Sequence, residues 1–340
     1  MKKLICVILA ILMTASVLFV TGCGNNNGTS GGAKDDNTKL KLGMGVYSYY
    51  EQATGATEDA NGKGQVVSTV AAVLVDANGK IVKCDLDTAD NTVEFTAEGK
   101  TVSKTDFKTK REQGDSYGMK QYAGSAKEWY EQADAFEALA VGKTAAEVKA
   151  LVAAEGKGNA DVISAGCTIA VSDFAKAIEK AVKNAKESNA VAANTLKVGA
   201  ATEVTYKDAT EEAQGSIELE TSFVASAVGA DGKVVATVSD CLGTTFTFDE
   251  VGTPLTNTQT PLSTKLELGD SYGMKASYGS TKEWYQHSAA FDTQCVGKTA
   301  AEIAGLVTSD GKGNADVVGA GCTISVSSMV KAAVKAATVG

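Results

Sequence analysis

β-prone runs rich in apolar residues, broken by polar turns, recur in the first part of each half of this 340-residue chain and predict strands. Two β-prone runs flank Asn78-Gly79 within residues 73–87, and two more flank Asp231-Gly232 within residues 223–238. An Asn-Gly or Asp-Gly pair between such runs is a strong local signal for a β-hairpin. Further strands are predicted at residues 92–95 and 245–248.

A helical period follows these strands. Trp129, Ala133 and Phe136 recur at a spacing that places them on one face of a helix, which predicts a helix over residues 126–140. Two more helices follow in the same half of the chain.

The first of these helices has a recognisable start. Thr144 and Glu147 have the spacing of a capping box, in which each residue binds the backbone N–H of the other. The helix that they start is expected to end near Gly156. Ser172 is expected to cap a third helix over residues 173–186.

The pattern occurs twice because the chain contains an internal repeat. Residues 114–120, 127–130 and 158–169 return 155 positions later as residues 269–275, 282–285 and 313–324. Strands first and helices afterwards indicate the α+β class. We therefore expect two tandem copies of one domain, each an antiparallel sheet or hairpin region followed by about three helices. The expected boundaries are residues 40–186 and 195–340, with a linker over residues 187–194.

The N-terminus has the pattern of an export signal. Two lysines precede an apolar run that is short for a membrane-spanning helix and suits the core of a signal peptide over residues 1–22. Val20-Thr21-Gly22-Cys23 resembles the bacterial lipoprotein box, which implies lipidation of Cys23. Residues 23–39 are then a flexible polar tether. The alternative is an uncleaved anchor in which Cys23 is a spare thiol.

Charge limits the classes of partner. The chain carries 32 Lys and Arg against 41 Asp and Glu, a net charge of −9, and removal of the signal makes it two units more negative. Such a surface argues against nucleic acid and against anionic lipid head groups. Attachment to a membrane is therefore expected through the lipid anchor only.

Cysteine and histidine usage excludes several kinds of site. Apart from the signal and lipid cysteines there are five, at long spacings and with no Cys-x-x-Cys, so no metal site is expected. The single histidine, His287, stands where the first repeat has Gln132. It is expected to be a solvated helix residue outside the repeated chemistry.

Two glycine motifs are rejected. Gly142-Lys143-Thr144 lacks the first glycine of a P-loop and follows a predicted helix rather than a strand. Gly43-Met44-Gly45 lacks the third glycine and the helix of a dinucleotide-binding fingerprint.

Aromatic residues and methionines recur in the second part of each repeat. Trp129 is expected to pack in a core. For Tyr117 two interpretations stay open, core packing and a stacking wall for a flat ring, because this residue lies in a glycine-flanked loop. Met119 lies in the same loop, and Tyr272 and Met274 are the second-repeat counterparts.

The segment from Asp161 to Thr168 is the sharpest candidate for chemistry. Its small residues let the backbone approach a ligand closely. The Thr168 hydroxyl precedes a predicted helix, whose N-terminal N–H groups favour a phosphate. The competing interpretation is a buried strand that leads into a helix, with Cys167 as a small core residue.

This segment resembles the Asp-x-x-Ser-Gly-Ala-Thr motif of covalently flavinylated FMN-binding domains. Together with Gly-Asp-Ser-Tyr-Gly-Met-Lys, Lys-Glu-Trp-Tyr and Val-Gly-Lys-Thr, it is similar to the two-domain flavinylated pheromone lipoproteins of Gram-positive extracellular electron transfer. The resemblance covers nearly the whole mature chain. The spacing from Asp to Thr is one residue longer than in the motif, Cys167 and Cys322 replace Ala, and Gly319 stands in the place of Ser164.

The resemblance implies a function. A flavin transferase joins FMN from FAD to each threonine as a phosphoester, giving two covalent FMN groups per chain. The protein would be an electron carrier more than an enzyme with its own substrate. It would stand at the extracellular face of the cell membrane, between membrane quinol-oxidising electron-transfer proteins and a ferric or soluble flavin acceptor. The implied binding residues are Thr168, Thr323, Asp161, Asp316, Gly166 and Gly321, and the repeated loop adds Tyr117, Tyr272, Met119 and Met274 to the expected set.

Two alternatives remain. One is a non-redox cell-surface binding lipoprotein in which the repeated segments are structural. The other is that the cleaved signal yields a secreted peptide pheromone, a role separate from the folded part.

Overall fold

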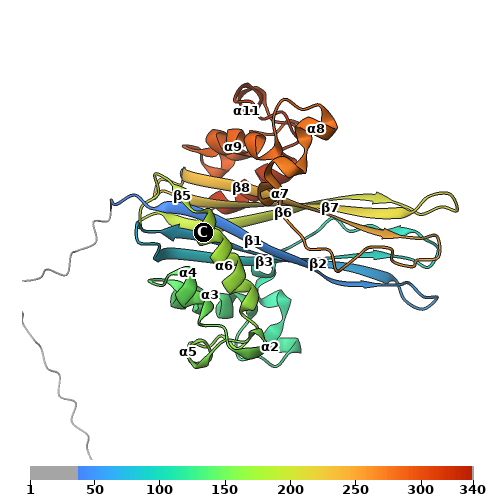
Figure 1. The fold of residues 1–340 in the computed structure, drawn as a ribbon, viewed down its shortest axis with the longest axis horizontal. Coiled ribbons are helices and arrows are strands. Elements are labelled where there is room, and N and C mark those ends of the chain that lie inside the picture. Colours follow the sequence, from blue (N-terminus) through green and yellow to red (C-terminus); the bar gives the residue numbers. More distant parts are fainter. Residues whose placement is uncertain (1–36, 339–340) are drawn as a thin grey trace, which may run out of the picture. The chain divides into compact units, whose positions relative to one another are not determined.

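The computed structural model describes residues 37–338, so the expected signal peptide and Cys23 lie outside the described residues. Within residues 37–338 the order of the main elements occurs twice (Figure 1), and two short elements of the first repeat, at residues 101–102 and 154–156, have no counterpart in the second. The strands of the first repeat are β1 (Lys41–Thr54), β2 (Gly62–Val75), β3 (Ile81–Phe95) and β4 (Thr101–Val102). Its helices and 3₁₀ turns are α1 (Lys110–Gln113), η1 (Gly114–Tyr117), α2 (Met119–Tyr122), α3 (Trp129–Ala140), α4 (Ala145–Lys149), η2 (Ala154–Gly156), α5 (Ala160–Ser164) and α6 (Ser172–Asn184).

The second repeat follows a short strand, β5 (Lys186–Glu187). Its strands are β6 (Thr195–Lys207), β7 (Gly215–Val228) and β8 (Val234–Phe248). Its helices and turn are α7 (Lys265–Leu268), η3 (Gly269–Tyr272), α8 (Met274–Tyr278), α9 (Trp284–Cys295), α10 (Ala300–Ala304), α11 (Ala315–Gly319) and α12 (Ser327–Ala337).

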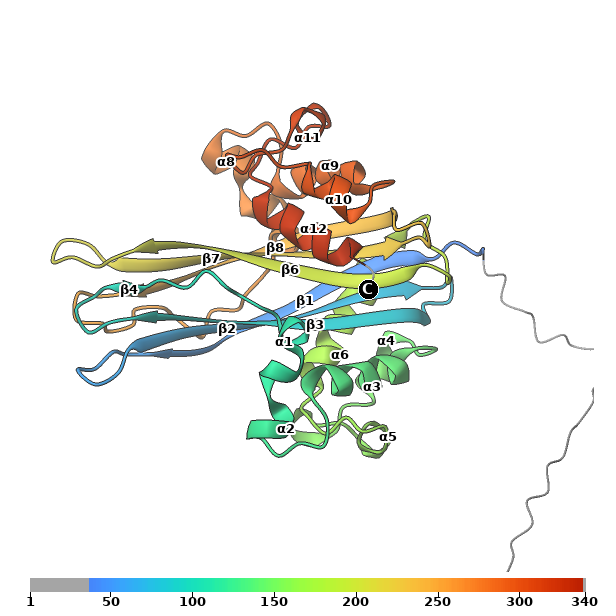
Figure 2. The same ribbon diagram turned by 180° about the vertical axis from the view of Figure 1, so that it is seen from behind.

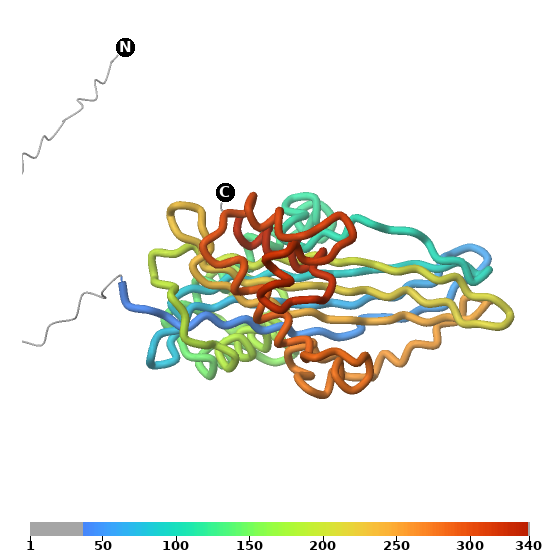
Figure 3. The backbone as a smooth tube through the Cα atoms, turned by 90° about the horizontal axis from the view of Figure 1, so that it is seen from above, coloured from blue at the N-terminus to red at the C-terminus, as the bar shows by residue number. Residues whose placement is uncertain are grey.

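The strands form two antiparallel sheets, which confirms the α+β class. One sheet has the order β4-β3-β2-β1-β5 and the other the order β6-β7-β8. Both predicted hairpins are present, because β2 pairs with β3 and β7 pairs with β8 across the Asn-Gly and Asp-Gly turns. Figures 2 and 3 show the long strands of the two sheets running along a common direction.

The inner faces of the two sheets cover each other. Apolar side chains from both sheets form one cluster, in which the rings of Phe95 and Phe248 stack with centroids 4.4 Å apart. Between the two sheets, the buried amide of Asn91 donates hydrogen bonds to the hydroxyls of Thr202 and Thr221, at 3.0 and 3.1 Å. These bonds satisfy the polar groups that the core encloses.

Helices cover the outer face of each sheet. In the first repeat, α3 and α6 pack on β1, β2 and β3 through a second core, and in the second repeat α9 and α12 pack on β6, β7 and β8 through a third. Each helical layer therefore rests on its own sheet and reaches the other repeat only through the sheets and a few edge contacts.

Two of these edge contacts are reciprocal. Lys180 of α6 forms an ion pair with Glu267 of α7 at 2.6 Å, and Lys335 of α12 forms one with Glu112 of α1, also at 2.6 Å. Lys335 and Glu267 are the repeat counterparts of Lys180 and Glu112. Such reciprocity is the contact pattern of a two-fold interface.

The expected division into two domains stays a prediction. The described residues belong to one compact unit, and its inner core draws on both repeats. The expected linker is also partly structural. Its first residue, Glu187, pairs with Lys41 of β1, and Ala190 is fully buried.

Several expected boundaries were wrong. The separate strands expected at residues 92–95 and 245–248 are the ends of β3 and β8, which continue through an unbroken ladder. The helix expected from residue 126 begins at Trp129, where Glu128 supplies the cap. The helix that Thr144 starts ends at Lys149 rather than near Gly156, although its capping box is confirmed.

The third helix also differs from the expectation. It ends at Asn184, and the residue at the N-cap position is Val171 rather than Ser172. The Ser172 hydroxyl instead donates to the neighbouring Asp173 carboxylate.

The rejected glycine motif at the start of β1 has a packing role. A Cβ at Gly43 or Gly45 would clash with backbone atoms of α6, at Ala181 and Ala177. Gly199 of β6 lies in the same way against α12 at Ala332. Glycine at these positions lets each helix lie directly on the backbone of its strand.

We expect Gly45→Ala to lower the free energy of unfolding by about 1–3 kcal/mol, because the added methyl overpacks the contact with α6. Gly243→Ala is the matched control, since it adds a methyl to a strand glycine with open space around it. It should be neutral or stabilising by up to about 1 kcal/mol. Urea denaturation measures both, and equal effects of the two variants would contradict the packing role.

Candidate functional site

The candidate site of the first repeat is built around the start of α3. Glu128 is 3% exposed, and its carboxylate accepts hydrogen bonds from the backbone N–H groups of Met119 and Lys120, at 2.8 and 3.2 Å. Glu283 does the same for Met274 and Lys275. The repeated Lys-Glu-Trp-Tyr segment thus ties the loop that carries the methionine to the helix behind it.

The segment from Asp161 to Thr168 forms a short helix and a turn, so the alternative of a buried strand was wrong. Asn159 caps α5 by accepting from the N–H groups of Asp161 and Val162. The chain then turns at Gly166, which has a φ of 91°. Thr168 follows as an exposed residue.

A lysine ammonium lies against this turn. Lys127 donates to the carbonyl of Ala165 at 3.2 Å, and a Cβ at Gly166 would occupy the position of the ammonium group. In the second repeat Lys282 donates to the carbonyl of Gly321 at 3.0 Å, and Gly321 has a φ of 98°. Glycine is therefore required here for its backbone conformation and for the space that the lysine fills.

Gln132 joins the two segments of the first site. Its side-chain oxygen accepts hydrogen bonds from the backbone N–H of Thr168 at 2.8 Å and from the Thr168 hydroxyl at 3.1 Å. Its amide nitrogen donates to the hydroxyl of Ser125 and to the carbonyl of Lys127, both at 3.2 Å. This fully buried amide therefore fixes Thr168 to the loop that carries Met119.

His287 takes the place of Gln132 in the second repeat, and the expectation that it is solvated was wrong. Its side chain is 1% exposed. The Thr323 N–H donates to Nδ1 at 3.2 Å, and Nε2 lies 3.3 Å from the Ser280 hydroxyl. The residue lies inside the candidate site because the turn at residues 321–323 folds over the start of α9.

The structure separates other expected site residues from the threonines. Asp161 and Asp316 are exposed in the first turns of α5 and α11, and among residues 37–338 no hydrogen bond joins their carboxylates to Thr168 or Thr323. Cys167 and Cys322 are fully buried core residues, and burial raises the pKa of each thiol, that of Cys322 to about 11.

Tyr117 and Tyr272 pack against the helical cores. The Lys110 ammonium lies 5.0 Å from the ring centre of Tyr117, and the Lys265 ammonium lies 5.2 Å from that of Tyr272. One face of each ring is thus covered by a cation. Trp129 is 4% exposed and makes an edge-to-face contact with Phe174, which confirms core packing.

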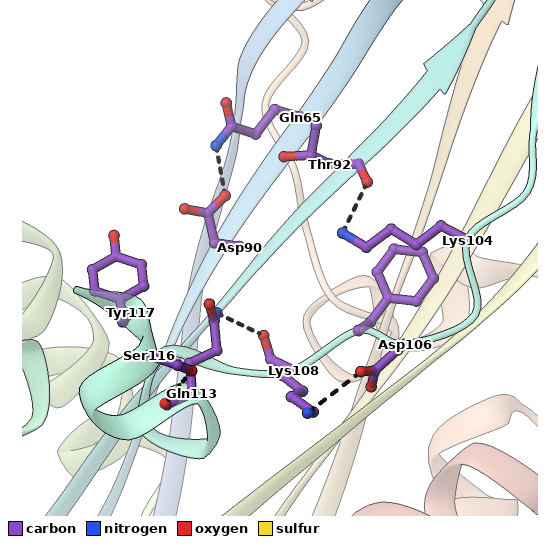
Figure 4. Close-up of a pocket in the computed structure, with 10 residues that line it drawn as sticks. Gln65, Asp90, Thr92, Lys104, Asp106, Lys108, Gln113, Ser116 and Tyr117 are labelled. Carbon is purple, nitrogen blue, oxygen red and sulfur yellow. Dashed lines mark hydrogen bonds and ion pairs between the residues drawn. The ribbon is translucent and has the colours of Figure 1, made fainter. Parts of the chain in front are cut away.

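A polar pocket of about 370 Å³ lies beside Tyr117 (Figure 4). Its lining residues include Asp90, Lys104, Asp106, Lys108 and Tyr117. Thr168 is not among the lining residues, so this pocket is not centred on the candidate threonine.

Partly buried carboxylates fix the helices that carry Gln132 and His287. Glu137 of α3 accepts from the backbone N–H of Leu86 at 2.8 Å, and its counterpart Asp292 of α9 accepts from that of Ser239 at 3.2 Å. Glu137 is also paired with Arg111 at 2.7 Å, whereas the second repeat has Leu266 in place of the arginine. Burial raises the pKa of Asp292 to about 7.

Among residues 37–338, no group of three or more His, Cys, Asp or Glu side chains could hold a metal ion. Within the same range, no helix combines the length and the apolar character needed to cross a membrane.

Comparisons with known proteins give one partial similarity. A protein named chlorophenol reductase, from Desulfitobacterium hafniense, is 36% identical over 124 residues. The match covers 33% of this chain and 37% of that protein. No family model matches the chain, and no solved structure matches it.

Asp292 should make stability depend on pH. Its pKa in the folded state, about 7, lies above the value of about 4 that an unfolded aspartate has. The folded chain therefore retains a proton that the unfolded chain loses, and this contribution to stability is lost as the pH rises from about 4 to about 7. In Asp292→Asn the fall in unfolding free energy should be shallower by up to about 1.4 kcal/mol per pH unit. Urea denaturation at a series of pH values tests this, and parallel curves for the two proteins would disprove it.

Gly166→Ala should destabilise the turn for two reasons, its positive φ and the displacement of Lys127. Gly142→Ala isolates the first reason, because Gly142 has a φ of 82° and open space around its Cβ position. Both variants should lose about 1–2 kcal/mol from backbone strain. Gly166→Ala should lose about 1 kcal/mol more, because the hydrogen bond of Lys127 is broken. Denaturation curves of equal midpoint would show that the ammonium group contributes nothing.

Proposed function

We propose that the protein is an electron carrier with FMN joined covalently to Thr168 and Thr323, one group on each FMN-binding-like repeat. The observation that carries the proposal is the repeated pairing of an exposed threonine with a lysine ammonium across a glycine turn. The hydroxyl supplies the attachment point for a phosphoester, and the ammonium group favours its negative charge.

The exposed hydroxyl meets the first requirement. In the first repeat the Gln132 side-chain oxygen accepts hydrogen bonds from the Thr168 hydroxyl and from the Thr168 N–H, so the lone pairs of the hydroxyl oxygen are free to form a bond to phosphorus. When FAD is the donor, the threonine oxygen replaces AMP at the phosphorus of the FMN half, and the hydroxyl proton is released.

The lysines meet the second requirement. A phosphodiester carries a negative charge, and the Lys127 and Lys282 ammonium groups lie at the turns just before the threonines. The flavin supplies one- and two-electron chemistry when bound, while the protein holds and orients it. The residues of the site therefore need no general acid or base of their own.

The wider assignment follows from the same proposal. Attachment through Cys23 would keep the protein at the extracellular face of the cell membrane. There it would pass electrons from membrane quinol-oxidising proteins to ferric iron or a soluble flavin. The similar protein is named a reductase, which is also redox chemistry, but the proposal rests on the site. A non-redox binding lipoprotein is the rival function.

The test is the intact mass of the mature chain made together with a flavin transferase. The mass should rise by two FMN increments, and the yellow colour should survive denaturation. Thr168→Val and Thr323→Val each remove a hydroxyl with little change in shape, so each should lose one increment and the double variant both. Thr168→Ser keeps the hydroxyl and should keep the increment.

The bound flavin should then bleach on reduction and regain its colour when ferric iron is added. An unchanged mass of the wild-type chain would rule out the carrier and favour the rival function. Retention of both increments in the double variant would exclude these two threonines as the attachment points.

A further inference from the structure

The two candidate sites differ in the side chain that holds the threonine. Gln132 and His287 are at equivalent positions, both are buried, and both accept the backbone N–H of the threonine. A glutamine amide has no proton to gain at ordinary pH, whereas an imidazole does. The repeats thus share a geometry but not a response to pH.

The Nδ1 atom of His287 lies between two groups that require opposite roles. The N–H of Thr323 lies 3.2 Å away and needs an acceptor, whereas the carbonyl of Gly321 lies 3.1 Å away and needs a donor. One nitrogen serves only one of these partners at a time, because it either carries a proton or presents a lone pair.

The neutral ring with its proton on Nε2 satisfies every neighbour. Nδ1 then accepts from Thr323, and Nε2–H donates to the Ser280 hydroxyl, which itself donates to the carbonyl of Lys282 at 2.8 Å. The Gly321 carbonyl is still bonded, because the Lys282 ammonium donates to it. With a proton on Nδ1, the ring instead donates to Gly321, and the Thr323 N–H loses its acceptor.

The surroundings of His287 favour the neutral ring. Burial lowers the pKa of His287, the Gly321 carbonyl opposes this shift, and the positive charge of Lys282 adds to it. Two carboxylates lie nearby along the same helix, but both are engaged elsewhere. Glu283 binds the N–H groups at the start of α8, and Asp292 binds Ser239.

We propose that His287 is a proton-dependent positioning residue, which holds Thr323 in place when neutral and releases it when protonated. The first site has no such dependence, because Gln132 holds Thr168 at every pH. On the proposed function, attachment of FMN to Thr323 therefore falls in acid, while attachment to Thr168 follows only the pH dependence of the transferase.

The positioning role can be tested without flavin. His287 is the single histidine of the chain, so a mature protein without a histidine tag gives one set of imidazole signals in an NMR titration. The nitrogen signals should show Nε2 protonated and Nδ1 unprotonated in the neutral ring. Exchange of the Thr323 amide proton, corrected for intrinsic pH dependence, should accelerate below the His287 midpoint, and that of Thr168 should not.

Reciprocal exchange of the two residues provides matched controls. In His287→Gln the protection of the Thr323 amide should no longer depend on pH, and in Gln132→His the protection of the Thr168 amide should begin to do so. The proposal is overturned if the neutral ring carries its proton on Nδ1. It is also overturned if the exchange rate of the Thr323 amide does not change across the His287 midpoint.

The flavin consequence needs a ratio of the two sites. Peptide mass mapping measures FMN on Thr323 relative to Thr168 after brief reaction with the transferase, once at a pH below the His287 midpoint found by NMR and once above it. Below the His287 midpoint the ratio of initial rates should fall by up to about tenfold per pH unit. His287→Gln should make the ratio independent of pH, and Gln132→His should bring both sites to the same dependence.

The outcomes separate the two proposals. A constant ratio in the wild-type chain overturns the link between His287 and attachment. Absence of flavin from both threonines at every pH overturns the proposed function, while the amide exchange result still decides the positioning role of His287.

Discussion

The mutual burial of the two inner sheet faces is the constraint on which the rest of this structure depends. A sheet with helices on one face leaves the other face apolar and open to water, and here each sheet covers that face of the other. The stacked rings of Phe95 and Phe248 and the Asn91 hydrogen bonds lie in this interface. Each helical layer therefore packs on a sheet whose other face is also buried.

Polar contacts between the helices and the sheets fix the geometry of the candidate sites. Glu137 and Asp292 tie α3 and α9 to the sheets, and these helices present Gln132 and His287 to the turns that carry the threonines. The exposed threonines are thus held by side chains that water does not reach. An exposed side chain on a loop is hard to hold in one position without such buried contacts.

Local signals predicted the parts of the fold that local chemistry determines. The hairpin turns and the Thr144 capping box depend on neighbours within four residues, so the sequence was sufficient for them. The strand β1 was missed, because its glycines serve α6, some 130 residues later, rather than the strand itself. Burial of His287 was equally hidden, because it depends on a turn that lies 34 residues further along the chain. The packing of the two sheets against each other could not be predicted either, because a run of apolar residues indicates that both faces of a strand are buried but not what covers each face.

The reciprocal ion pairs Lys180–Glu267 and Lys335–Glu112 are the contacts that two identical subunits would make across a dyad. In a homodimer any substitution appears in both subunits, so both sites must change together. A fused pair keeps the dyad packing and frees each copy to vary by itself. One chain can then combine a glutamine in one site and a histidine in the other, an asymmetry that no symmetric dimer of a single gene product can adopt.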